Sequence, residues 1–152
     1  DLAFRGVVTN ISAVEKNNGL IVTQIEFGIT KLYKGKYSSS KIVVEQLGGT
    51  YKDKTLYVPG ILAHKLGEEA ILFLEQKADG SWVTRGSGRF LVDRSGKHPT
   101  VSRNFGGGSL MKVSGRVATP IEEPPTLTVE RLGDFEDRIV ELVNSLVGNG
   151  AN

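Results

Sequence analysis

Hydrophobic and polar residues alternate along much of the first hundred residues, as they do in strands with one buried face. In the segment 21–30, Ile25, Phe27 and Ile29 share one face, while the even positions 24, 26 and 30 carry Gln, Glu and Thr. This period of two predicts a long strand in a sheet that has one face in water.

The segment 2–14 shows the same alternation with one interruption. Its apolar residues fall first on even positions and then, from Ile11, on odd positions. Such a switch requires a bulge or an irregular residue near Thr9 and Asn10, and Gly6 offers little resistance to curvature. We therefore expect this strand to bend around a barrel.

Shorter strands follow, and sharp turns separate them. Asn17–Gly19 and Asp79–Gly80 have the residues that hairpin turns favour, and Gly48–Gly49 marks a third turn. The segment 61–69 has no clear period and fits either a loop or a single helical turn. The short strands are predicted at residues 42–44, 55–58, 70–76, 82–84, 90–92 and 100–102.

The pattern changes after residue 103. Three consecutive glycines and three prolines make residues 104–127 an expected loop. Thr128 can cap the free amides of a helix, which we expect over residues 128–147 with a stop at Gly148. We expect this helix to pack on the barrel by Leu132, Phe135, Ile139 and Leu142. The full apolar stripe consists of Val129, Leu132, Phe135, Ile139, Leu142, Val143 and Leu146.

These elements predict a mainly β fold, in which residues 1–103 form a small antiparallel β-barrel and one C-terminal amphipathic helix packs on it. A chain of 152 residues suits one domain with one core, so we expect residues 1–152 to form a single domain. The 19 glycines exceed the usual frequency of about 7% and fit a fold with many turns. No apolar run approaches the roughly 20 residues of a membrane-spanning helix, so no membrane span is expected.

Charge is unevenly distributed along the chain, although the net charge is only +2. Residues 1–120 carry 17 Lys or Arg and 10 Asp or Glu, while residues 121–152 carry 2 and 7. We therefore expect the acidic C-terminal part to cover some of the basic surface of the barrel. A basic surface that is neutralised in this way is a poor match for nucleic acid.

Residues that carry metal, thiol or nucleophile chemistry are sparse. The chain has no cysteine, and His64 and His98 lack partners at metal-ligand spacing, so both are expected to be surface or loop histidines. No serine lies in a Gly-x-Ser-x-Gly motif. The glycine loop 105–109 lacks the lysine and the following helix of a phosphate-binding loop. We expect no metal, no cofactor and no enzymatic activity, and an enzyme whose site assembles only in space is the alternative.

Basic and aromatic side chains are concentrated between residues 82 and 116. A basic groove with stacking aromatic rings is how small barrels hold single strands or sugars. A glycan or a single-stranded nucleic acid is therefore an alternative ligand, bound by the basic region 85–116. The candidate binding residues are Lys34, Lys36, Arg85, Arg89, Arg103, Asn104 and Phe105.

Four short segments of the barrel part carry a family resemblance. They are Asp1–Val8 (DLAFRGVV), Tyr33–Gly35 (YKG), Lys41–Leu47 (KIVVEQL) and Gly67–Leu74 (GEEAILFL). They resemble the netrin-like module, the OB-type barrel shared by tissue inhibitors of metalloproteinases and by cysteine-free relatives in secreted bacterial proteins. The resemblance implies an OB-like barrel in a secreted or cell-envelope (periplasmic) protein that binds a partner without a reaction of its own.

The inhibitory mechanism of that family does not extend to this chain. The metalloproteinase inhibitors chelate the catalytic zinc through a cysteine at their N-terminus, and this chain has no cysteine. The resemblance implies instead that barrel loops are presented to a protein partner, with proteases as one class of partner. We therefore predict a non-enzymatic, extracytoplasmic binding module for a protein.

Overall fold

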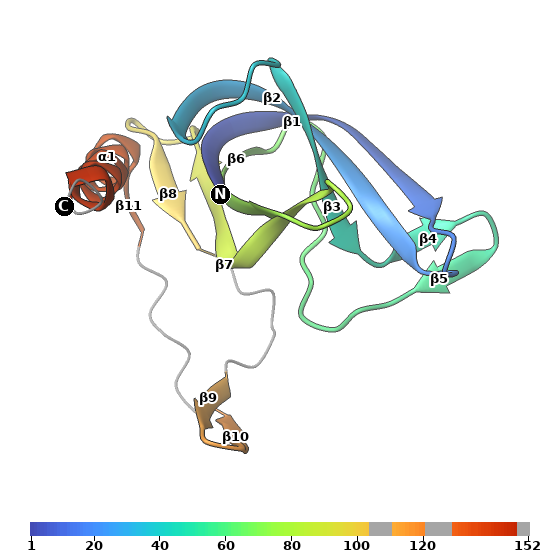
Figure 1. Cartoon of the computed structure of the whole chain (residues 1–152). Helices are drawn as coiled ribbons and strands as arrows, with labels where there is room; N and C mark the ends of the chain where they lie inside the picture. Colours follow the sequence, from blue (N-terminus) through green and yellow to red (C-terminus); the bar gives the residue numbers. More distant parts are fainter. Residues whose placement is uncertain (104–110, 121–128, 149–152) are drawn as a thin grey trace.

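The computed structural model describes residues 1–103, 111–120 and 129–148, which form strands and one helix (Figure 1). The elements are β1 (Leu2–Glu15), β2 (Ile21–Lys34), β3 (Lys41–Leu47), β4 (Gly49–Tyr51), β5 (Lys54–Leu56), β6 (Glu69–Gln76), β7 (Trp82–Asp93), β8 (Thr100–Ser102), β9 (Met111–Ser114), β10 (Val117–Pro120), β11 (Glu130–Arg131) and α1 (Leu132–Gly148).

Five strands close into an OB-like barrel in the order β1, β2, β3, β7 and β6, because β6 pairs with both β7 and β1. The predicted small barrel with one helix is confirmed. Four of the five pairs are antiparallel, and β3 runs parallel to β7 at Val44–Trp82 and Glu45–Val83. Alternation did not predict this parallel pair, since it shows which face of a strand is buried and not which strands are neighbours.

Strand β1 curves around the barrel by means of bulges. Its register against β2 shifts three times, the last time between Val8 and Asn10, where the sequence predicts a bend. Gly6 adjoins another of these shifts and lies close to β2. A Cβ atom at Gly6 would lie 2.7 Å from the carbonyl oxygen of Gly28, so this approach requires glycine.

The inner faces of the five strands form the main core. In β6, Ala70, Leu72 and Leu74 belong to this inner core, whereas Ile71 and Phe73 belong to a second cluster outside the barrel. The uninterrupted apolar run of β6 is therefore covered on both faces. The buried residues of the inner core are Leu2, Phe4, Val8, Ile25, Phe27, Ile42, Val44, Ala70, Leu72 and Leu74.

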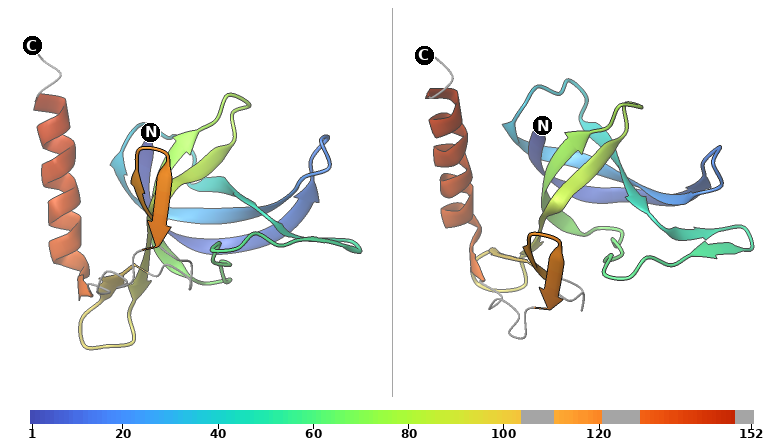
Figure 2. Two further views of the ribbon diagram at one scale, coloured as in Figure 1. Left: turned by 90° about the horizontal axis from the view of Figure 1, so that it is seen from below. Right: turned by 60° about the horizontal axis from the view of Figure 1, so that its bottom comes forward.

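Helix α1 stands beside β8 and covers the outer cluster (Figures 1 and 2). Its buried side chains are Leu132, Phe135 and Ile139. The helix begins later than predicted, because the two residues before it pair with β8 as β11. The predicted packing of Leu142 is wrong: this side chain is 65% exposed, since the buried contacts of α1 lie in its N-terminal half. Within the described residues, no helix is long and apolar enough to cross a membrane.

Part of the segment expected to be a loop, residues 104–127, forms a hairpin instead. Strands β9 and β10 pair antiparallel from Val117–Ser114 to Pro120–Met111. The turn between them contains Gly115 at φ 63°, a conformation that glycine adopts without strain. The remainder of this expected loop lies outside the described residues.

Candidate functional site

Residues 57–68, here called the plug loop, connect the hairpin β4–β5 to β6 and close the barrel. The side chain of His64 is only 4% exposed. Its ring meets the ring of Phe27 edge to face, with 5.4 Å between the ring centroids. Because Phe27 belongs to the inner core, His64 seals the barrel interior at this point. His64 lies in a loop, which is one of the two places predicted for it, but its side chain is buried rather than at the surface.

Arg89 on β7 holds the plug loop from the barrel side. Its guanidinium donates to the carbonyl oxygens of Leu62 and Ala63 over 3.0 and 3.3 Å, and to Oε1 of Glu68 over 2.7 Å. The same Oε1 lies 2.8 Å from Nδ1 of His64. Burial raises the pKa of Glu68, but hydrogen bonds to His64 and Arg89 outweigh it, so the pKa lies below its ordinary value. Glu68 is therefore ionised at neutral pH and paired with the guanidinium.

Further hydrogen bonds fix the backbone of the plug loop. Nε2 of Gln46 donates to the carbonyl oxygen of Leu62 over 2.8 Å. Val8 on β1 donates its amide to the carbonyl of Glu68 and accepts from the amide of Gly67, both over 2.9 Å. A loop held at several points has little conformational entropy left to lose when it binds a partner.

Large apolar side chains of this fixed loop face the solvent. Tyr57 is 80% exposed, Leu66 is 68% exposed and Ile61 is also exposed. The sequence held one signal for Ile61 and Leu66, whereas Tyr57 falls in the strand predicted at residues 55–58. Apolar residues in the segment 61–69 follow no period, so they cannot all share one buried face.

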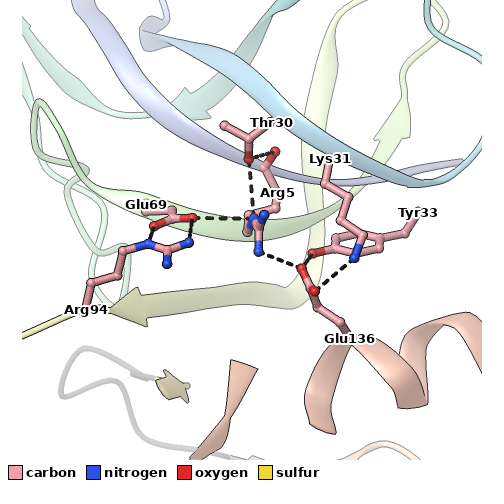
Figure 3. A network of polar contacts seen from close by, with 7 residues as sticks. All are labelled: Arg5, Thr30, Lys31, Tyr33, Glu69, Arg94 and Glu136. Carbon is pink, nitrogen blue, oxygen red and sulfur yellow. Dashed lines mark hydrogen bonds and ion pairs between the residues drawn. The ribbon is translucent and has the colours of Figure 1, made fainter. Parts of the chain in front are cut away.

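A second polar cluster, here called the anchor cluster, joins α1 to the barrel (Figure 3). The carboxylate of Glu136 accepts hydrogen bonds from Nη1 of Arg5 over 2.7 Å, from Nζ of Lys31 over 2.9 Å and from the hydroxyl of Tyr33 over 2.5 Å. Arg5 comes from β1, and the other two donors come from β2. Three barrel side chains thus hold one carboxylate of the helix.

Glu69 on β6 completes the anchor cluster on the other side of Arg5, whose Nε lies 3.4 Å from Oε1 of Glu69. Arg94 binds Glu69 through Nε and Nη2, over 2.5 and 2.8 Å. Burial, reinforced by the hydrogen bond to Glu136, raises the pKa of Tyr33. Because the cations and carboxylates of the cluster pair with one another, its chemistry is attachment of α1 rather than capture of an external anion.

The basic residues predicted to form one binding site lie at separate places in the structure. Lys34 and Arg85 converge on Asp1, whose Oδ2 lies 3.5 Å from Nζ and 3.2 Å from Nη1. Lys36 is exposed two positions beyond Lys34. Arg89 lies under the plug loop, and a register shift of β7 against β6 separates it from Arg85.

Arg103 occupies a third place. Its guanidinium carbon lies 4.5 Å from the ring centroid of Phe90, which packs against the outer cluster under α1. Asn104 and Phe105 lie outside the described residues. The described members of the predicted binding set therefore do not line one groove.

Comparison with protein-family models, with curated proteins and with solved structures finds no match to this chain. Across residues 1–103, 111–120 and 129–148, no three His, Asp or Glu side chains come together in a group that could hold a metal ion.

Proposed function

We propose that the chain is a non-enzymatic, extracytoplasmic binding module that engages a protein partner through the plug loop of its barrel. The observation that carries the proposal is that the plug loop, whose backbone is held at Leu62, Ala63, Gly67 and Glu68, exposes large apolar side chains to the solvent. These side chains are Tyr57, Ile61 and Leu66. Tyrosine is one of the side chains that dominate the binding energy of protein interfaces. Because the loop is already ordered, binding loses little entropy.

A protein fits this surface better than an anionic polymer does. Binding to single strands requires several cations along one groove, with aromatic rings for the bases. Arg85, Arg89 and Arg94 each pair with a carboxylate of this chain, and they do so in different places. A polyanion would have to displace those carboxylates before it could bind.

The resemblance of the barrel segments to the netrin-like module supports two finer parts of the proposal. These are a location outside the cytoplasm and a protease as the first class of partner to be tested. Contact would be made by side chains of the plug loop, since the chain lacks the cysteine that chelates zinc in the metalloproteinase inhibitors.

The proposal is tested by binding measurements with a surface variant. Wild-type chain and the double variant Tyr57→Ser/Leu66→Ser are immobilised and exposed to the secreted fraction of the source organism and to a panel of secreted proteases. We expect saturable binding of a protein by the wild type and about tenfold weaker binding by the double variant. Circular dichroism checks that the variant keeps the fold.

The matched control is Val117→Ser/Val129→Ser, which removes two exposed apolar side chains elsewhere in the described chain. This control should bind as tightly as the wild type. The proposal is wrong if no saturable protein partner is found, or if the plug-loop variant binds as tightly as the wild type.

A further inference from the structure

The second half of β1 has a free edge. Strand β6 pairs with β1 only from Leu2 to Val7, whereas β2 pairs with β1 as far as Glu15. Within the described residues, no strand pairs with β1 beyond Val7 on the side away from β2. An unpaired edge of this kind is a template for one more strand.

The hydrogen bonds of β2 show which groups of β1 point to this edge. Antiparallel strands alternate between residue pairs that exchange hydrogen bonds and pairs that do not. The carbonyl oxygen of Ile21 accepts from the amide of Gly48 over 2.9 Å, so the odd-numbered residues of β2 turn their backbone groups toward β3 and away from β1. Ile11, Ala13 and Glu15 lie opposite residues 25, 23 and 21. Their N–H and C=O groups therefore point away from β2.

Other parts of the chain limit this edge at both ends. At one end, the plug loop bonds to both backbone groups of Val8 and turns away from β1 at Lys65. At the other end, the hairpin β4–β5 reaches Glu15, whose Oε1 lies 2.8 Å from Nζ of Lys54. Residues 11–15, here called the free edge, therefore remain for a partner.

The chemistry of the free edge determines what kind of segment can bind it. Three residues with outward N–H and C=O groups offer donors and acceptors at the spacing of a strand. A helix has its own backbone groups already bonded, so an extended segment is needed to satisfy them. Pairing along five residues buries far less than the roughly 1,200 Å² of a standard interface, which argues against two copies joined edge to edge.

The free edge begins beside an exposed side chain of the plug loop. Leu66 is 68% exposed and directly precedes the two residues that bond to Val8. An extended segment on the free edge would therefore have one end beside Leu66. One partner can thus contact the free edge and the plug loop together.

We propose that the free edge of β1 binds an extended segment of the partner protein, which joins the barrel as one more strand. The inference deepens the proposed function and rests on it, because it gives the form of the segment that the plug loop recognises. Main-chain hydrogen bonds supply affinity in this mode of recognition, and side-chain contacts such as the one at Leu66 supply specificity.

Selection from a phage-displayed library of random peptides tests the inference. The full chain is immobilised, and we expect enrichment of peptides that bind saturably. With an enriched peptide bound, amide hydrogen exchange at Ile11, Ala13 and Glu15 should slow by about tenfold or more, because these amides gain acceptors. Ser12 and Val14, which already bond to β2, should exchange equally slowly with and without the peptide.

The variant Ala13→Pro removes one outward N–H without removing a bond to β2, and edge strands tolerate proline at such positions. It should bind the enriched peptides about tenfold more weakly than the wild type does. The matched control is Ser12→Ala, which should bind like the wild type because the edge is recognised through its backbone. Peptides N-methylated at alternate residues give a second measurement on the unaltered chain, and one of the two methylation patterns should abolish binding.

Several results would each overturn the inference. They are the absence of enriched peptides, unchanged exchange at Ile11, Ala13 and Glu15, full binding by a folded Ala13→Pro, and full binding by both N-methylated forms. A second copy on the free edge would overturn it as well, and would raise the average mass above 16.4 kDa as these amides become protected without peptide. Failure here is distinguishable from failure of the proposed function, because capture of a protein through Tyr57 and Leu66 does not require the free edge.

Discussion

Gly6 shows how one residue sets the curvature of the barrel. A Cβ atom here would lie 2.7 Å from the carbonyl oxygen of Gly28 and 2.8 Å from the ring of Phe4. The ring of Phe4 is packed in the inner core and cannot move aside freely. We expect Gly6→Ala to lower the free energy of unfolding by about 1–3 kcal/mol, measured by urea denaturation.

Gly133 is the control for Gly6→Ala. No heavy atom lies within 4 Å of a Cβ atom added at Gly133, which is in the first turn of α1. Gly133→Ala should leave stability unchanged or raise it by up to about 1 kcal/mol, since alanine is the better helix former. If Gly6→Ala were as stable as Gly133→Ala, the close approach of β1 to β2 would not constrain the barrel.

Residue-level prediction from the sequence was good for backbone features and poor for polar partners. Glycine and the switch of alternation marked the bend of β1, because both act locally on the backbone. The pairing of Arg89 with Glu68 spans 21 positions, and the same carboxylate oxygen contacts the ring of His64. The spacing of residues along the sequence does not encode such contacts, so residues 61–69 were predicted only as a loop or a single helical turn.

At the scale of elements, α1 offers a direct comparison between a covered and an uncovered position of its apolar stripe. Ile139 is buried in the outer cluster, whereas Leu142 is exposed. We expect Ile139→Asp to destabilise the docked helix by about 3–5 kcal/mol, because it buries an unpaired charge. Leu142→Asp should change the stability by less than about 0.5 kcal/mol. Thermal melts distinguish the two, and equal melts would mean that α1 is not docked.

The anchor cluster makes attachment of α1 sensitive to acid. Burial alone would raise the pKa of Glu136, but hydrogen bonds from Tyr33 and Lys31 and the charge of Arg5 outweigh it, so the pKa lies below its ordinary 4.5. The stabilisation is therefore complete above that ordinary value and is lost as the pH falls through the lower pKa of the folded chain.

Glu136→Gln tests this dependence. At pH 7 the variant should be less stable than the wild type by about 1.5–3 kcal/mol, the usual contribution of a hydrogen bond to a charged group. As the pH falls below 4.5, the two stabilities should converge, because the wild-type carboxyl group also becomes neutral. Glu141→Gln, on the exposed side of α1, is the control and should follow the wild type. A constant difference between wild type and Glu136→Gln at all pH values would contradict the interpretation.

Strands with a clear alternation of apolar and polar residues were predicted well, but the strands that pair with them were not. The alternation in residues 21–30 lies within β2, and Ile25 and Phe27 face the inner core. The parallel pairing of β3 with β7 and the hairpin β9–β10 involve choices among strands of similar pattern. Periodicity identifies a buried face, and the partner that covers it is decided by the whole chain. Leu142 illustrates the limit, since its position in the apolar stripe of α1 predicts burial that the barrel does not provide.

For the whole molecule, the unevenly distributed charges form ion pairs with one another within the chain. The acidic helix places Glu136 between basic side chains of β1 and β2, and Arg94 and Arg5 meet Glu69. We therefore expect no shift of a single-stranded oligonucleotide by the chain at low salt, where electrostatic binding is strongest. A gel-shift titration measures this. A shift that disappears in Arg85→Ala/Arg103→Ala would instead favour the basic region as a nucleic-acid site.

Closure of the barrel has a consequence for how the chain is made. Leu2 pairs with Leu74, and Phe4 pairs with Leu72, so the first strand lacks one neighbour until β6 has been synthesised. Translation adds roughly 5–20 residues per second, so the apolar inner face of the β1–β2 hairpin stays uncovered for several seconds before β6 is made. Pairing between such distant residues also slows refolding, which we expect on a scale of milliseconds to seconds. Aggregation during expression should therefore arise from the nascent first hairpin, and it should be relieved by slower growth or by chaperones rather than by changes to the finished surface.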